Sequence, residues 1–401
     1  MLPSTRNELK DERSKDNAKA SYPTVNLLWQ LSRRIGISRR MLPTFKMIIV
    51  LGASVIVLLY YLSFNWTIFV EDRSYGIAAV QGQQVRYMIE SRSCPDTKKI
   101  CYTVYDAVDM FTGDVNRFLV TQHIRKKQET VVRLIPPPGI KSRESDSRFW
   151  KINHTHINRQ YVAVMLTVPF SVAALVLSNY ASLAANVLII GLGGGSMNMF
   201  LTNHFPKITI TVVELDEVVI DLARRWFELD KKHEKMQIIK MNGVKFIEEA
   251  VAKKVLFDVV FIDVCEDGDL ICPAESFIRP NFIENLKKIL KPTGIVVLNI
   301  LPFENGFDQV DEVLSFKYQT IVNGVVRAYQ KQFPTCAFAP LRREMNTILA
   351  CQIVQQIDPH ASQRLISQRF QEAWSHFGFT KQFGVMEVSF IDKKIKAKNI
   401  S

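Results

Sequence analysis

The chain has 401 residues, 47% of them hydrophobic and 22% charged, an ordinary globular composition that excludes disorder throughout. Its six cysteines, none in a Cys-x-x-Cys pair, are too few for a disulfide-built scaffold and predict no metal site. Residues 1–46 carry half of the net charge of +12, so the rest of the chain has no concentrated basic footprint and we expect no nucleic-acid partner.

The N-terminal segment combines a basic tail with a long uncharged run. Residues 1–45 are polar and basic, and we expect them to be mostly disordered. The 24 residues between Lys46 and Glu71 carry no charge, and about 20 apolar residues suffice to cross a bilayer as a helix. Tyr60 and Trp66 lie toward one end, where such rings settle at the membrane interface. We therefore predict a transmembrane signal anchor over residues 46–70 that contacts the lipid bilayer; a buried core helix is the alternative.

The charges that flank this run predict its orientation. Five Lys or Arg lie between residues 33 and 46, whereas only Arg73 and Arg86 follow the run within 20 residues. Because positive charge stays on the cytosolic side, we expect a single-pass type II protein whose large domain is lumenal or extracellular. Asn65 and Asn153 begin Asn-x-Thr glycosylation sequons, which agree with that placement.

Two pairs of cysteines lie across predicted turns. Cys94 and Cys101 flank a turn-like segment, and Cys336 and Cys351 flank a hairpin-like stretch centred on residues 343–344. In a hairpin with that two-residue loop, the numbers of paired residues sum to 687, as 336 and 351 do. Each pair is therefore either a disulfide or two packed thiols.

The remainder of the chain divides into two parts. Residues 71–149 show short runs of Val, Ile, Tyr and Phe broken by turn sequences, which predict a small β-rich subdomain followed by a linker. Residues 150–395 are expected to form one larger domain. Its apolar run at 161–177 predicts a buried helix rather than a second membrane span, because the strand and glycine loop that follow need a helix as cover.

In the larger domain, strand and helix patterns alternate regularly. Such alternation predicts an α/β, Rossmann-like, doubly wound and mostly parallel sheet. The expected strands are 186–191, 208–214, 236–240, 256–263 and 294–300. One expected helix follows the glycine loop and ends near 204, and the others cover 217–229, 244–252 and 280–290. Residues 333–340 and 347–354 predict an antiparallel hairpin at the edge of the sheet.

A glycine-rich loop follows the first of these strands. Gly191, Gly193, Gly194 and Gly195 open a predicted helix, and glycines there let the backbone approach a ligand closely. Glu214 ends the second strand, 23 positions after Gly191, where a carboxylate accepts hydrogen bonds from ribose hydroxyls. We expect removal of Glu214 to weaken nucleoside binding at little cost to folding.

Two later positions complete the predicted site. Asn242 follows the third strand, where a side chain would reach an adenine, and Asp263 lies at the carboxyl edge of the fourth strand, where ligands collect. Dinucleotide binders carry a third glycine at the sixth position of the loop, but this chain has Ser196 there. The spacing therefore favours a nucleoside such as that of S-adenosylmethionine over a dinucleotide. A surface or helix-capping role stays open for Glu214 and Asp263.

These motifs carry a family resemblance. The loop at Gly193, the sequences Val-Val-Glu-Leu-Asp and Phe-Asp-Val-Val-Phe-Ile-Asp, and the segment Cys272-Pro-Ala-Glu-Ser-Phe277 resemble the spermidine synthase-like branch of the S-adenosylmethionine-dependent methyltransferase superfamily. Within it, the chain is most similar to the methyltransferase-like family whose C-terminal domain methylates the N-terminus of elongation factor 1-alpha. The resemblance covers about residues 150–395 and implies S-adenosylmethionine as cofactor, with the four glycines, Glu214, Asn242 and Asp263 as its binding residues.

Departures from aminopropyltransferases decide between activities. Those enzymes have Asp where this chain has Ser196 and Asn242, and a short polyamine-binding loop where Glu266, Asp267 and Asp269 occur here. We therefore expect methyl transfer to an amine or protein substrate, with Asp263 as the catalytic base or amine-orienting group. Aminopropyl transfer is one alternative, and a catalytically inactive membrane-anchored scaffold is another. A homodimer also stays open.

Overall fold

The structure is a computed structural model of the whole chain. It describes Ser54 and residues 68–392, except for 73–75, 82–83, 94–99, 110–111, 122–126, 140–144, 230–232, 266–271, 302–311, 342–343, 345, 356–358 and 387–388. The chain divides into two compact units, residues 1–66 and 67–401.

An antiparallel sheet of seven strands forms the N-terminal part of the second unit, in the order β1 to β7. Its strands are β1 (Ile68–Asp72), β2 (Gly76–Gln81), β3 (Gln84–Ser93), β4 (Ile100–Asp109), β5 (Val115–Thr121), β6 (Lys127–Ile135) and β7 (Lys151–Ile152). The sheet covers the residues where the sequence predicts a β-rich subdomain, 71–149, and extends beyond them at both ends. β-Branched and aromatic residues fill these strands because they pack well on a pleated surface.

A second sheet has eight strands in the order β10-β9-β8-β11-β12-β14-β13-β15. The strands from β10 to β12 are parallel, whereas β14, β13 and β15 each pair antiparallel with their neighbours. Its strands are β8 (Asn186–Ile190), β9 (Thr209–Glu214), β10 (Met236–Lys240), β11 (Phe257–Ile262), β12 (Leu290–Ile300), β13 (Thr335–Pro340), β14 (Thr347–Gln352) and β15 (Ser389–Asp392).

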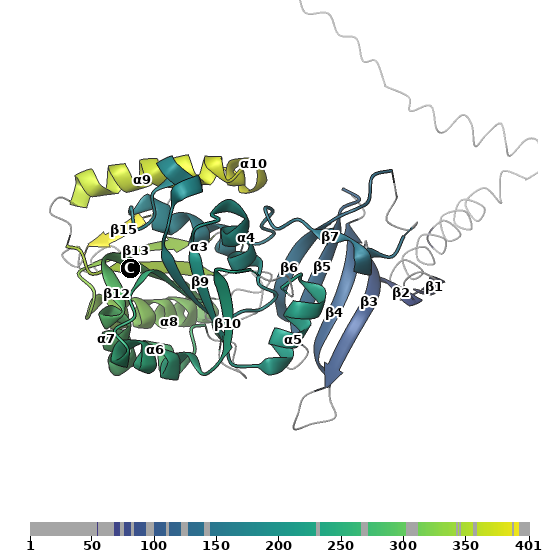
Figure 1. The fold of residues 1–401 in the computed structure, drawn as a ribbon, viewed down its shortest axis with the longest axis horizontal. Coiled ribbons are helices and arrows are strands. Elements are labelled where there is room, and N and C mark those ends of the chain that lie inside the picture. Colours follow the sequence, from purple (N-terminus) through teal and green to yellow (C-terminus); the bar gives the residue numbers. More distant parts are fainter. Residues whose placement is uncertain are drawn as a thin grey trace, which may run out of the picture. The chain divides into compact units, whose positions relative to one another are not determined.

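Helices cover both faces of the second sheet (Figure 1). They are α3 (Gln160–Ser171), α4 (Ser196–His204), α5 (Glu217–Trp226), α6 (Gly243–Ala252), α7 (Pro280–Lys288), α8 (Glu312–Gln330), α9 (Pro359–His376) and α10 (Phe379–Phe383). Alternate strand residues serve the two faces: Val187 and Ile189 pack with α3, α4, α5 and α9, whereas Leu188 and Ile190 pack with α6, α7 and α8. The first of these cores continues into the N-terminal sheet through residues such as Val104 and Leu119.

The predicted α/β, Rossmann-like architecture is therefore confirmed, and the predicted elements fall within a few residues of the observed ones. The edge hairpin is present as β13 and β14, with Cys336 opposite Cys351. These two form a disulfide with a Cα–Cα distance of 4.1 Å. The hairpin is not the outermost element, because β15 pairs with β13 on its far side. The sequence interpretation also missed α8, α9 and α10.

The predicted membrane anchor at 46–70 lies almost wholly outside the described residues. β1 begins at Ile68, so the last three residues of the predicted run belong to a strand. None of the helices that the structure describes is long and apolar enough to span a membrane. The apolar run at 161–177 forms α3, which is buried along nearly its whole length, as predicted.

Candidate functional site

The glycine loop lies at the carboxyl edge of the parallel strands, between the end of β8 and the start of α4. Its four glycines fall into two classes. Gly191 and Gly193 are partly exposed and have positive φ angles of 97° and 51°. Gly194 and Gly195 are buried, and a Cβ atom on them would lie 2.8 Å from Thr130 or Phe227 and from Leu229, respectively. Packing therefore requires the missing side chain at Gly194 and Gly195, and the positive φ of 77° at Gly195 favours glycine as well. Approach to a ligand, the predicted reason for the motif, stays a prediction.

Gly191 also fixes the loop against the strand that carries Asp263. A Cβ atom on Gly191 would lie only 2.2 Å from the backbone oxygen of Asp263. The backbone N–H of Asp263 in turn donates to the carbonyl of Ile190 at 2.9 Å. Two parts of the predicted site therefore touch through their main chains.

The N–H groups of the loop are mostly committed to protein acceptors. Gly191 donates to the Val213 carbonyl at 2.9 Å, Leu192 to Glu214 Oε2 at 2.9 Å, and Gly194 to Thr130 Oγ1 at 2.7 Å. Gly195 donates back to the carbonyl of Leu192. Among the described residues, Gly193 is the loop position whose N–H has no protein acceptor, so this donor is left for a ligand.

Glu214 lies where the sequence predicts, at the end of β9 and facing the loop. Its carboxylate accepts the N–H of Leu192 at Oε2 and the N–H of Asp216 at Oε1, both at 2.9 Å. Each carboxylate oxygen can accept a second hydrogen bond, so the group can still receive ribose hydroxyls. Burial raises the pKa of the Glu214 carboxyl above its ordinary value, against the opposing effect of the N–H donors. The expectation that Glu214 is dispensable for folding is wrong, because it holds two backbone donors in place.

Two residues beside Glu214 are suited to the flat face and edge of a base. Leu215 is 64% exposed and directly follows Glu214, so its apolar side chain is accessible at this edge. Asn242 caps α6, with Oδ1 accepting the N–H groups of Val244 and Lys245 at 2.9 and 3.3 Å. Because Oδ1 already accepts these two N–H groups, the amide nitrogen of Asn242 is the part of the side chain left for a base.

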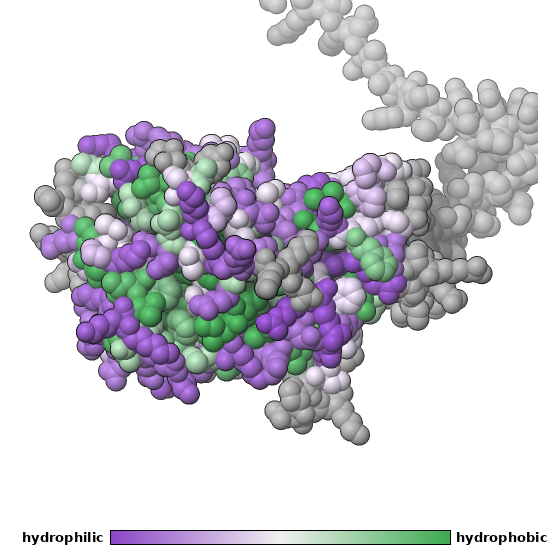
Figure 2. All heavy atoms as spheres, viewed as in Figure 1, coloured by the Kyte–Doolittle hydropathy of each residue, from purple (hydrophilic) through white to green (hydrophobic). Residues whose placement is uncertain are grey.

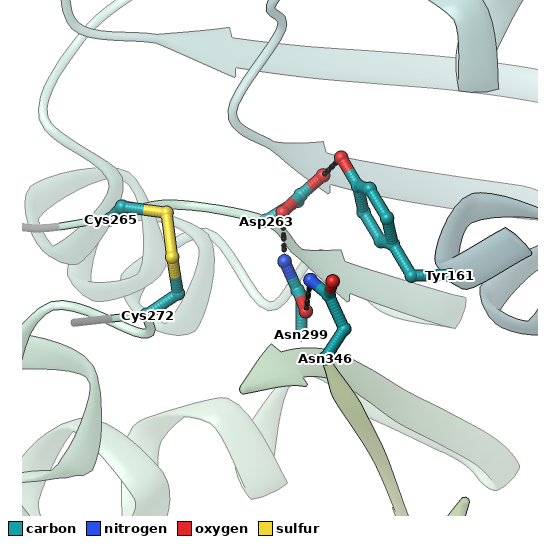
Figure 3. Close-up of a disulfide and its surroundings, with 6 residues drawn as sticks. All are labelled: Tyr161, Asp263, Cys265, Cys272, Asn299 and Asn346. Carbon is teal, nitrogen blue, oxygen red and sulfur yellow. Dashed lines mark hydrogen bonds between the residues drawn. A yellow bond between two sulfur atoms is a disulfide. The ribbon is translucent and has the colours of Figure 1, made fainter. Parts of the chain in front are cut away.

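Asp263 lies at the end of β11 and holds two hydrogen-bond donors. The Tyr161 hydroxyl donates to Oδ2 at 3.2 Å, and the Asn299 amide donates to Oδ1 at 2.9 Å (Figure 3). The partners are a phenol and an amide, both uncharged. These two donors fix the orientation of the carboxylate at the carboxyl edge of β11.

A chain of polar contacts supports Asp263 from the β13–β14 hairpin. Asn346 donates from Nδ2 to Oδ1 of Asn299 at 2.8 Å, and both residues are buried. Glu344, in the same hairpin loop, accepts the N–H groups of Gln160 and Tyr161 at 3.2 and 2.8 Å. A carboxylate at this helix start is favoured by the helix dipole. The hairpin loop therefore holds both Asp263 and its partner Tyr161.

A second disulfide lies beside this network. Cys265 and Cys272 are joined with a Cα–Cα distance of 4.2 Å, two residues beyond Asp263 (Figure 3). Cys272 is fully buried and exchanges two backbone hydrogen bonds with Leu301 at the end of β12. The disulfide thus ties the chain after Asp263 to the neighbouring strand. The acidic residues predicted between the two cysteines, at 266, 267 and 269, lie outside the described residues.

The surface in Figure 2 shows hydrophobic residues gathered where Figure 1 labels β10, α8 and β12, bordered by hydrophilic ones. A cleft of about 360 Å³ opens beside β10 and α5. Its charged side chains are largely paired with one another, Arg92 with Asp221 and Lys240 with Glu217. That pairing makes the cleft a weaker candidate than the edge formed by Gly191, Glu214 and Asp263.

The structure brings the predicted site residues together at one edge of the sheet, but the sequence analysis missed the residues that support them. Tyr161, Thr130, Asn299 and Asn346 carry no local motif, and their contacts join segments 36 to 102 residues apart. The exposed Leu215 could have been noticed from its position directly after Glu214. The residues at the edge fit a nucleoside: a free N–H at Gly193, a carboxylate at Glu214 and an apolar face at Leu215. Fold and site together define a Rossmann-like, nucleoside-binding domain.

Comparison with protein families agrees with this class. Residues 172–314 match the family model described as the spermine/spermidine synthase domain. The match agrees with the resemblance to the spermidine synthase-like branch of the methyltransferase superfamily that the sequence motifs carry.

The relatives lie in that branch. The human eEF1A lysine and N-terminal methyltransferase is 27% identical over 192 residues, which are 46% of this chain and 24% of that protein. Its homologue in Drosophila melanogaster is 27% identical over 240 residues, or 59% of this chain and 31% of the homologue. The chain thus spans less than a third of the length of these relatives. The polyamine aminopropyltransferase of Methanocaldococcus jannaschii is 33% identical over 117 residues, 28% of this chain and 37% of that enzyme.

Solved structures show only distant likeness. Human methyltransferase-like protein 13 in complex with SAH aligns with a TM-score of 0.43 and 23% identity, covering 54% of this chain and 90% of the other. A probable spermidine synthase from Corynebacterium glutamicum aligns with a TM-score of 0.49 and 15% identity, covering 77% and 90%.

Proposed function

We propose that the chain is an S-adenosylmethionine-dependent methyltransferase that acts on an amine, carried by a protein or a small molecule. The observation that carries the proposal is the Asp263 carboxylate. It lies against the glycine loop through Gly191 and accepts hydrogen bonds from Tyr161 and Asn299, which orient it. The similarity to the eEF1A methyltransferases supports the same reaction class.

Each residue of the edge has a role in this proposal. Glu214 would hold the ribose hydroxyls, the Gly193 N–H the carboxylate of the methionine part, and Leu215 and Asn242 the base. Bound S-adenosylmethionine supplies a methyl group on a positively charged sulfur. Asp263 binds the acceptor as an ammonium and accepts its proton, which frees the nitrogen lone pair for bond formation to the methyl carbon. Tyr161 and Asn299 keep the carboxylate turned toward the acceptor.

The test has a binding step and a transfer step. Calorimetry with S-adenosylmethionine on the full chain in detergent comes first, because binding at micromolar cofactor is expected and none at millimolar would favour an inactive scaffold. Transfer of labelled methyl to eEF1A and to lysine-containing or free-N-terminal peptides then tests the amine class. Asp263→Asn keeps the shape but not the charge, so turnover should fall about 10²- to 10⁴-fold with a much smaller change in cofactor affinity.

Aminopropyl transfer is the second candidate, favoured by the similarity to the archaeal polyamine aminopropyltransferase. Ser196 argues against it, because the aspartate that the family uses at this position is missing. Incubation with decarboxylated S-adenosylmethionine and putrescine decides the matter. Formation of spermidine would replace the methyltransferase proposal, and its absence together with methyl transfer would support it.

We also propose that the N-terminal run anchors the chain in a membrane, with the second unit on the lumenal or extracellular side. Because β1 begins at Ile68, the anchor would end before that residue. The cysteines support this side: all five that the structure describes are in disulfides, which persist in oxidising compartments and are rare in the cytosol.

Glycosylation offers a direct test of that topology. In the Asn153 sequon, the side-chain oxygen of Asn153 accepts the N–H and the hydroxyl of Thr155 at 3.2 and 2.8 Å, and Thr155 is exposed. We expect a mobility shift on glycosidase digestion that Asn153→Gln abolishes. Complete digestion of the second unit by protease added to intact microsomes would contradict the proposed orientation.

A further inference from the structure

The N-terminal antiparallel sheet contacts the nucleoside edge directly. Thr130, in β6, accepts the N–H of Gly194 at 2.7 Å. The contact is enclosed, since Thr130 is 6% exposed and Gly194 is buried. A Cβ atom on Gly194 would lie 2.8 Å from the Thr130 methyl group, so the loop is pressed against the sheet. Thr130 therefore fixes the position of the loop beside the free N–H of Gly193.

A second contact reaches the segment after Glu214. The hydroxyl of Tyr102, in β4, donates to Asp216 Oδ2 at 2.7 Å. Asp216 in turn caps α5 through Oδ1 and the N–H of Val218, and its own N–H donates to Glu214. Tyr102 thus acts on the residue that orients the predicted ribose-binding carboxylate.

A buried ion pair keeps the sheet in register with α5. Arg117 and Asp106 are almost fully buried and pair at 2.8 Å. Arg117 also donates to the carbonyls of Trp226 and Ser147 at 2.9 and 2.8 Å, which joins β5 to the end of α5. Because breaking such a buried pair is costly, the sheet and the parallel domain are held as one body at this point.

From these contacts we infer that the N-terminal sheet is part of the cofactor site, with Thr130 as the residue that positions the glycine loop. The sheet supplies this contact from β6, which lies outside the region 172–314 that matches the family model. The inference rests on the proposed function for the identity of the ligand. It adds a positioning residue that touches the loop and not the ligand.

Removing the Thr130 acceptor changes the glycine loop before the ligand binds. Thr130→Val keeps the side-chain shape but removes the acceptor, which leaves the Gly194 N–H buried and unpaired. The free loop then shifts to hydrate this donor, and binding must restore the original conformation. The penalty therefore appears in the dissociation constant of the ligand.

The test measures S-adenosylhomocysteine binding to the full chain by calorimetry. We expect Thr130→Val to weaken binding roughly 5- to 150-fold and Thr130→Ser, which keeps the hydroxyl, to bind like the parent. Thr121→Val is the matched control, because Thr121 lies in β5 of the same sheet and is 7% exposed. Its affinity should be unchanged.

The outcomes separate the two proposals. If Thr130→Val melts at a lower temperature but binds with the parental dissociation constant, Thr130 is merely structural and the inference fails. If the parent protein itself binds no S-adenosylhomocysteine, the proposed function fails. Hydrogen exchange at Gly194 then still tests the contact: faster exchange in Thr130→Val than in Thr130→Ser and Thr121→Val supports a loop set by the sheet, and equal exchange overturns it.

Discussion

Replacing Glu214 with alanine should destabilise the protein as well as its nucleoside site. The carboxylate accepts two backbone donors, the N–H groups of Leu192 and Asp216, at 2.9 Å each. Leaving a buried donor unpaired costs about 1–3 kcal/mol, so losing both acceptors costs roughly 2–6 kcal/mol of folding free energy. At about 2–4 °C per kcal/mol for a larger domain, the melting temperature should fall by roughly 4–24 °C.

Glu214→Gln is the informative partner variant. Its amide oxygen can still accept one of the two N–H groups, while its NH₂ group faces the other. The loss of stability should therefore be about half that of Glu214→Ala, roughly 1–3 kcal/mol. Binding of S-adenosylhomocysteine should also weaken, because a neutral acceptor replaces a charged one for the ribose hydroxyls.

Thermal melts followed by calorimetry at a temperature where all variants are folded provide the measurement. The expected order of melting temperature is parent, then Glu214→Gln, then Glu214→Ala. An alanine variant that melts like the parent would refute the structural role of the two N–H contacts. A folded alanine variant that binds with parental affinity would place the nucleoside elsewhere.

Further consequences follow from the same contacts. Burial raises the pKa of Glu214 in the folded protein, so this group favours folding most at a pH below its ordinary pKa and progressively less as the pH rises through the raised pKa. Cofactor affinity should rise over that same pH range, because the carboxylate forms there. In calorimetry, Glu214→Gln should abolish this pH dependence. In Gly191→Ala, the new Cβ would lie 2.2 Å from the backbone oxygen of Asp263, so this variant should lose binding or fail to fold. Gly113→Ala is the control, because Gly113 also has a positive φ, 73°, but no atom lies within 4 Å of the new Cβ. A denaturant melt should show a loss of only about 1–2 kcal/mol for it. Replacing Cys336 and Cys351 together with alanine removes a 15-residue cross-link and should lower stability by about 3 kcal/mol, whereas an unchanged melt would show that the hairpin does not need it.

The parallel sheet could be predicted because its determinants are local. Each central strand is a short apolar run between turn residues, and β8, β9 and β11 place Gly191, Glu214 and Asp263 at one edge once the strands are parallel. The hairpin register followed from loop length alone, which is why Cys336 and Cys351 were found opposite each other. The periodicity of apolar residues in the strands and the residue types in the turns are sufficient to predict such features.

The supporting residues could not be predicted, because nothing local distinguishes them. Thr130 resembles any strand threonine until Gly194 is brought against it, and Tyr161 resembles any helix tyrosine until its hydroxyl meets Asp263. The packing role of part of the glycine motif was not predicted for the same reason, because the packing partners are distant in the sequence. Gly194 and Gly195 look like ligand contacts in the sequence, but their missing side chains make room for Thr130, Phe227 and Leu229.

In the proposed site, the spacing between the glycine loop and Asp263 is set by main chain rather than by side chains. Gly191 meets the backbone oxygen of Asp263, and the Asp263 N–H binds the carbonyl of Ile190 directly before that glycine. A side-chain bridge could change rotamer, whereas two backbone contacts between adjacent parallel strands cannot shift without breaking the sheet. In-line methyl transfer tolerates little misplacement of its reacting atoms, so a loop and a carboxylate that share a backbone contact are suited to it. Side-chain support from Thr130 on one flank and Asn299 on the other then only has to orient groups whose separation is already fixed.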